Sequence, residues 1–190
     1  MSKIIEFQKI IVAVPNQKTI NIESLSFKTG DTIQVNAASG RGKSYLYHTF
    51  LGMTESSKTL YKSGVPQHNL FAYCPASLNF FSATVQEELD RVHDDDMGLH
   101  ECLDFGLIDS SFLGKKCNDL SNGENQLLVF LRGALSKKPI IILDELTNSM
   151  DLNLREKIWS YIQSVLLNRC AVIYNSHFQS EIVPNKIISF

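Results

Sequence analysis

Long apolar segments are missing from this sequence. Apolar runs such as 139–143 and 164–167 are far shorter than the roughly 20 residues that a membrane-spanning helix needs. We therefore expect no transmembrane helix in this chain. If the protein works at a membrane, it must reach that membrane through a partner.

Paired cysteines and basic clusters are missing as well. The four cysteines, Cys74, Cys102, Cys117 and Cys170, form neither a Cys-x-x-Cys pair nor a metal-ligand spacing, and no signal peptide precedes them. Reduced thiols in the cytosol fit this pattern best. The formal net charge is -2, and lysine and arginine are spread along the chain rather than gathered in a stripe. Nucleic acid is therefore not an expected partner.

The sequence does contain enough apolar material for one domain. With 190 residues, of which 44% are hydrophobic, the chain can bury a core, so we expect a single domain over residues 1–190. Apolar or alternating segments predict strands at 10–14, 19–22, 32–36, 140–143 and 171–174. Apolar spacings of three and four predict helices at about 43–51, 84–118, 121–135 and 151–165, with the acidic run 94–96 at a solvated helix end. This alternation predicts an α/β domain with a largely parallel sheet.

A glycine loop joins the expected strand at 32–36 to the helix that follows. Gly40, Gly42, Lys43 and Ser44 fit most of the phosphate-binding P-loop pattern. In that pattern backbone N–H groups surround the phosphates, the lysine reaches the β and γ phosphates, and the serine hydroxyl binds Mg²⁺. The residues expected to bind the nucleotide are Ala38, Ser39, Gly40, Arg41, Gly42, Lys43, Ser44 and Tyr45.

An ordinary flexible turn could have the same Gly-Arg-Gly-Lys-Ser residues. The strand before the loop, the helix after it and an acidic motif about a hundred residues later favour a nucleotide site instead. Ala37 stands where the pattern begins with glycine. Alanine would cost about 1 kcal/mol or more if this position needed a positive φ, and nothing otherwise.

Two adjacent carboxylates, Asp144 and Glu145, follow the apolar strand expected at 140–143. Ligands of open α/β sheets bind at the carboxyl ends of the strands. Asp144 would hold Mg²⁺ through its water shell, and Glu145 would orient the water that attacks the γ phosphate. A capped loop after the strand would explain one carboxylate but not the pair.

The segment Leu120-Ser121-Asn122-Gly123-Glu124 resembles the signature motif of the ABC (ATP-binding cassette) ATPases. Residues 147–151 are similar to the D-loop of that family, and His177 matches its switch histidine. The likeness covers nearly the whole chain in the right order. It implies a P-loop NTPase core of ABC ATPase type, with a mostly parallel sheet, an N-terminal antiparallel β subdomain and a small helical subdomain at approximately 84–135.

The resemblance also implies cofactors, a partner and site residues. In the family, two cassettes pack head to tail around ATP and Mg²⁺, as a homodimer or heterodimer. Ser121 and Gly123 would contact the γ phosphate held by the partner cassette, Asp151 would bridge the subunits, and His177 would hold the phosphate and the attacking water. By itself, the signature segment is equally typical of a helix N-terminus, and a lone histidine after a strand is more often structural.

The sequence departs from the family at three places. Ala76 stands where a Mg²⁺-contacting glutamine is usual, and residues 14–16 lack the aromatic that stacks on adenine. Asn122 replaces the first signature glycine. Together with Ala37, these departures predict slow ATP turnover rather than a dead enzyme, because Lys43, Ser44, Asp144, Glu145 and His177 are all present.

The leading interpretation is a transport ATPase that is cytoplasmic and held on the inner face of a membrane by a transmembrane permease partner. The apolar loop 77–82 would line the groove for that permease, although core packing would also explain Phe80 and Phe81. A soluble ABC ATPase of ribosomes or DNA is disfavoured by the single cassette and mild acidity. A weakly hydrolysing regulatory cassette is favoured by Ala76 and Asn122 but opposed by the intact Glu145.

Overall fold

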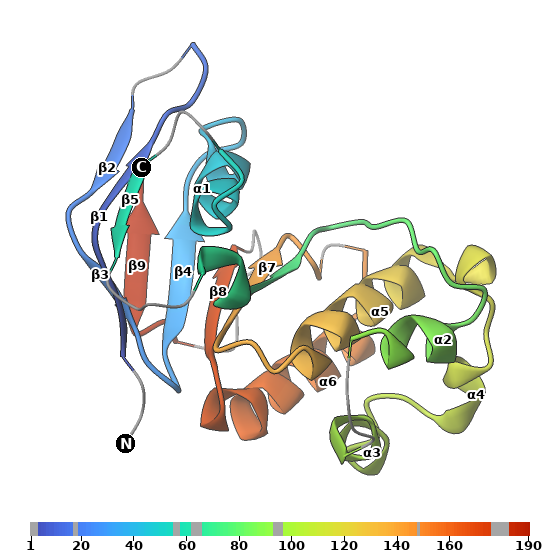
Figure 1. Ribbon diagram of the computed structural model, residues 1–190. Helices are drawn as coiled ribbons and strands as arrows, with labels where there is room; N and C mark the ends of the chain where they lie inside the picture. Colours follow the sequence, from blue (N-terminus) through green and yellow to red (C-terminus); the bar gives the residue numbers. More distant parts are fainter. Residues whose placement is uncertain are drawn as a thin grey trace.

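Two sheets and a group of helices make up the protein, and the helices α2 to α6 gather on one side of the parallel sheet (Figure 1). The structure is a computed structural model that describes residues 4–16, 19–54, 58–61, 66–92, 97–147, 149–175 and 183–190. Among these residues, none of the helices is both long and apolar enough to cross a membrane.

The smaller sheet is antiparallel and is built around β1. The strand β1 (Ile5–Val12) pairs with β2 (Ile20–Ile22), β3 (Leu25–Phe27) and β5 (Lys58–Tyr61). Ile10 pairs with Ile22 and Val12 with Ile20, so the strands expected at 10–14 and 19–22 are antiparallel neighbours. The first strand begins and ends earlier than the predicted 10–14, and β3 and β5 were not predicted, because segments this short carry little periodicity.

The larger sheet is parallel and has the strand order β6-β7-β8-β4-β9. Its strands are β4 (Thr32–Asn36), β6 (Phe71–Cys74), β7 (Ile140–Asp144), β8 (Ala171–Asn175) and β9 (Lys186–Ser189). The predicted strands at 32–36, 140–143 and 171–174 are therefore confirmed as neighbours in one parallel sheet. The strands β6 and β9 lie at its two edges and were not predicted.

The helical stretch expected at 84–118 consists of several short elements. They are α2 (Val85–Asp90), α3 (Met97–Asp104), α4 (Ser110–Leu113) and the 3-10 turn η2 (Cys117–Asp119). The breaks have local causes: Gly106 takes a φ of 73° after α3, and Asp109 caps α4 by accepting from the Phe112 N–H. The acidic run 94–96 lies outside the described residues.

Helices α1 (Lys43–Phe50), α5 (Asn122–Leu135) and α6 (Leu152–Ser164) lie where the sequence predicts them. Ser121 caps α5 in a capping box with Glu124, and Asp151 caps α6 through the Leu154 N–H at 2.8 Å. These caps satisfy backbone donors that a helix start otherwise leaves unpaired. Short 3-10 turns, η1 (Gln67–Asn69) and η3 (Leu166–Asn168), complete the described elements.

The parallel sheet separates two apolar cores because successive side chains of a strand point to opposite faces. Ile140 and Ile142 of β7 belong to the core beneath the antiparallel sheet and α1, whereas Ile141 and Leu143 belong to the core beneath α5 and α6. The phosphate loop and its helix therefore rest on one core, and the signature segment and its helix rest on the other.

Candidate functional site

The phosphate loop needs glycine at two positions. Gly42 precedes α1 with a φ of 103°, and a Cβ atom there would lie 2.7 Å from Val14 Cγ2. Gly40 has a φ of 75°. Ala37 is not among the described residues with positive φ, so alanine there carries none of the backbone strain that the sequence left open.

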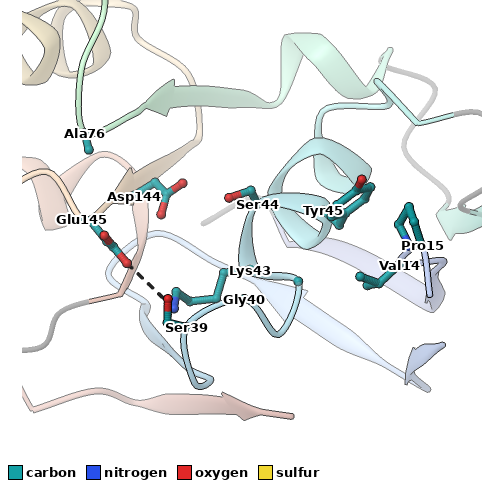
Figure 2. Close-up of a pocket in the computed structure, with 11 residues that line it drawn as sticks. Val14, Pro15, Ser39, Gly40, Lys43, Ser44, Tyr45, Ala76, Asp144 and Glu145 are labelled. Atoms are coloured by element: carbon teal, nitrogen blue, oxygen red, sulfur yellow. Dashed lines mark ion pairs between the residues drawn. The ribbon is translucent and has the colours of Figure 1, made fainter. Parts of the chain in front are cut away.

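Lys43 lies at the base of this loop with only 9% of its surface exposed. Its ammonium group donates to the Ala37 carbonyl at 3.1 Å and lies 3.8 Å from Glu145 Oε1 (Figure 2). A buried ammonium is stable only where oxygens compensate it. The lysine is therefore held between the phosphate loop and the acidic end of β7.

The two carboxylates at the end of β7 are held differently. Asp144 Oδ2 accepts a hydrogen bond from the Tyr73 hydroxyl at 2.8 Å. Glu145 takes a left-handed φ of 54°, and its backbone N–H donates to Asn175 Oδ1 at 2.9 Å. Positive φ is costly for a residue with a Cβ and tends to occur at functional sites, where the surrounding structure holds it in place.

Two tyrosines, Tyr47 and Tyr73, lie near Asp144. Burial, and then the negative charge of Asp144, raise the pKa of Tyr73 and of Tyr47 well above the usual value for a phenol. Both hydroxyls therefore stay protonated at neutral pH. The Tyr73 hydroxyl can then act as a permanent donor that orients the Asp144 carboxylate.

A pocket of about 370 Å³ brings the phosphate loop and the carboxylates together (Figure 2). This volume is typical of a small-ligand site. The lining residues are Val14, Pro15, Ser39, Gly40, Gly42, Lys43, Ser44, Tyr45, Ala76, Asp144 and Glu145. Ala38 and Arg41 belong to the same loop but not to this lining.

Ser44 and Asp144 could hold a magnesium ion. Their side chains come from α1 and the end of β7 and point toward one another across the pocket (Figure 2). Hydroxyl and carboxylate oxygens are the ligands that Mg²⁺ prefers, and Mg²⁺ usually takes only one or two carboxylates besides substrate phosphates. The donor set therefore fits this ion.

The signature residues do not join this pocket. Ser121 is exposed and caps α5, and Gly123 lies against the Ser149 carbonyl, 3.4 Å from the position that a Cβ atom would take. Asp151 is exposed and caps α6. These three residues lie apart from the phosphate loop of the same chain, and His177 lies outside the described residues.

The sequence reasoning missed three side chains that support the site. Gln126 is buried on α5, donates to the Ala76 carbonyl at 3.1 Å and accepts from the Ser149 N–H at 3.1 Å. It therefore joins the loop that follows β6 to the loop that follows β7. Tyr73 and Asn175 are the other two. In the sequence, Gln126 is an amide at the edge of the apolar run 127–131 and follows the signature segment closely.

Comparison with known proteins gives the family. Residues 20–148 match the family described as "ABC transporter". The chain belongs to that family. A relative from Ehrlichia ruminantium (strain Gardel), zinc import ATP-binding protein ZnuC, is 26% identical over 92% of this chain and 74% of its own length. ABC transporter G family member 20 from Dictyostelium discoideum is 28% identical over 88% of this chain, which spans only 25% of that protein.

Solved structures show the same fold. A bacterial Atm1-family ABC exporter with ATP bound superposes with a TM-score of 0.77 at 17% identity, covering 100% of this chain and 37% of the exporter chain. The α/β fold with its small antiparallel sheet is therefore confirmed as that of the ABC ATPases. The chain is the ATP-binding component of an ABC transporter, as the motifs predicted.

Proposed function

We propose that this ABC component binds Mg-ATP in the pocket of Figure 2 and hydrolyses the bond between the β and γ phosphates, which yields ADP and phosphate. The observation that carries the proposal is the convergence of Lys43, Ser44, Asp144 and Glu145 on one pocket from elements far apart in the sequence. Positioning and charge stabilisation supply nearly all of the catalysis in phosphoryl transfer. A lysine opposite two carboxylates offers both.

Each residue then has a distinct role. The N–H groups of residues 38–45 and the Lys43 ammonium bind the phosphates, and Ser44 and Asp144 hold Mg²⁺. Bound Mg²⁺ would offset the negative charge of the β and γ phosphates. Glu145 accepts a proton from the attacking water and orients it, while His177 contacts the γ phosphate.

Lys43 and Glu145 are already positioned for these roles. The Lys43 ammonium group donates to the Ala37 carbonyl and lies beside Glu145. Phosphate oxygens would compete with both for hydrogen bonds from this ammonium group. The left-handed backbone of Glu145 and its bond to Asn175 fix where its side chain leaves the strand end. Turnover is slow in this proposal because Ala76 offers no ligand to Mg²⁺ or to the attacking water.

A second cassette and a membrane permease are the proposed partners. Ser121, Gly123 and Asp151 lie outside their own pocket, so they remain available to the pocket of another cassette. Phe81 is 89% exposed, whereas Phe80 packs on the core with the Arg132 guanidinium over its ring. Phe81 lines one surface pocket together with Leu78 and Val92, and we assign this apolar surface to a permease at the inner face of the membrane.

The test is Mg-ATP hydrolysis by the purified chain beside its Lys43→Ala and Glu145→Gln variants. We expect slow turnover by the unmodified chain and a loss of at least 100-fold in each variant, because the first removes the phosphate cation and the second the water-orienting carboxylate. Light scattering should detect an ATP-bound dimer for Glu145→Gln.

Matched controls separate the site from general damage. Lys157→Ala removes an exposed lysine of α6 and should leave turnover unchanged. ATP binding without turnover and without a dimer would contradict the motor proposal and favour a regulatory cassette. Equal turnover by all four proteins would trace the activity to a contaminant.

A further inference from the structure

The pocket has two chemically different ends. Lys43, Ser44 and Asp144 form a charged and polar end, whereas Val14 and Pro15 form an apolar end. A ligand that combines phosphates with an apolar group would match both ends. Aliphatic side chains can cover an apolar group, but they present no aromatic face to a planar ring.

Tyr45 joins the two ends. It is the third residue of α1, directly after Ser44, and it lines the same pocket. Side chains of a helix lean toward its N-terminus, so Tyr45 leans over the turn that carries the phosphate loop. In Figure 2 its ring lies between Ser44 and the pair of Val14 and Pro15.

The ring of Tyr45 is accessible. Its neighbours Lys43, Leu46 and Tyr47 are buried, whereas Tyr45 keeps 37% of its surface exposed. No other aromatic residue lines the described pocket. An accessible aromatic ring beside a phosphate site is suited to stacking on a planar group that the phosphates carry.

We propose that Tyr45 stacks on the base of the bound nucleotide, with Val14 and Pro15 on the apolar side of the base. The proposal rests on nucleotide binding as stated above and assigns the part of the pocket that recognises the nucleoside. Stacking uses the π face that every base has. Tyr45 therefore favours nucleoside triphosphates over bare triphosphate but discriminates weakly between ATP and GTP.

The experiment compares the Kd of ATP, GTP and inorganic tripolyphosphate for the unmodified chain and for Tyr45→Ala and Tyr45→Phe, by calorimetry. We expect Tyr45→Ala to weaken both nucleotides about tenfold and to leave tripolyphosphate within twofold. Tyr45→Phe should bind like the unmodified chain. Phe105→Ala is the matched control, because Phe105 is also 37% exposed and lies outside the pocket.

Several outcomes would overturn the proposal. Equal weakening of ATP and tripolyphosphate by Tyr45→Ala would show that Tyr45 acts on the phosphates. Unchanged ATP affinity would show that Tyr45 contributes no binding energy to the nucleotide. Failure of the unmodified chain to bind either ligand would overturn nucleotide binding itself, which distinguishes that failure from the failure of Tyr45 alone.

A second measurement needs no variant. Photolabelling of the unmodified chain with 8-azido-ATP attaches the label to residues that contact the base. The label should appear on peptides containing Tyr45 or Val14. Label found only on peptides remote from both would overturn the assignment.

Discussion

The close packing of α5 on β6 leads to a quantitative prediction. Gly133 of α5 faces Cys74 of β6, and a Cβ atom at Gly133 would lie 2.3 Å from the Cys74 sulfur. Ordinary van der Waals contact begins near 3.4 Å. Cys74 is fully buried within the sheet, so the sulfur has little room to move away.

The substitution Gly133→Ala therefore has two opposing effects. Alanine gains about 1 kcal/mol of helix propensity over glycine. Overpacking of a core costs 1 to about 3 kcal/mol, and a contact this short belongs at the upper end. We expect a net loss of about 2 kcal/mol in the free energy of unfolding, equivalent to a fall of about 4–8 °C in Tm for a chain of this size.

A double-mutant cycle in urea tests the cause. Cys74→Ala removes the sulfur, so the new methyl group of Gly133→Ala can occupy its space. The double variant should be more stable than Gly133→Ala, with a coupling energy of about 3 kcal/mol, the size of the overpacking that Cys74→Ala relieves. Gly114→Ala is the control, because a Cβ there meets nothing closer than 3.8 Å. A Gly133→Ala protein as stable as the original, or a coupling below about 0.5 kcal/mol, would refute the reasoning.

Two further predictions concern the support of the site. Tyr73→Phe removes the hydrogen-bond donor to Asp144. The Mg²⁺ concentration for half-maximal ATPase activity should then rise about tenfold, while ATP binding without metal stays unchanged. An unchanged Mg²⁺ requirement would count against the role of Tyr73. Gln126→Leu leaves the Ala76 carbonyl and the Ser149 N–H without their partner. It should cost about 1–3 kcal/mol in the free energy of unfolding in urea and speed amide exchange at Ser149. Unchanged exchange at Ser149 would exclude the bridge.

The sequence predicted the nucleotide pocket because its parts are local. A P-loop is one continuous segment, and Asp144 and Glu145 follow one apolar strand, so order and spacing are enough to propose that they meet. The caps Ser121 and Asp151 are also local, because each bonds to a backbone N–H three residues later. The helix start at Ser121 is therefore confirmed, and the contact of Ser121 with a partner cassette stays a prediction.

The short elements could not be predicted with the same success. The strand β3 has only three residues, and β6 has four, which is too few for a period to stand out. Helical spacing at its start predicted a helix over 84–118, and yet the stretch holds several short helices, two of which are separated by Gly106 and the cap at Asp109. The role of His177 stays a prediction, because this residue lies outside the described residues.

By itself, the sequence determined the fold class and the family, and it predicted the phosphate loop and the carboxylates, because each depends on segments that are continuous in the chain. Only the tertiary structure decided how those groups are held. Tyr73 bonds to Asp144 from 71 residues away, and Gln126 bonds to Ala76 from 50 residues away. Such contacts leave no periodicity in the sequence, because they arise only when two separately formed elements pack against each other.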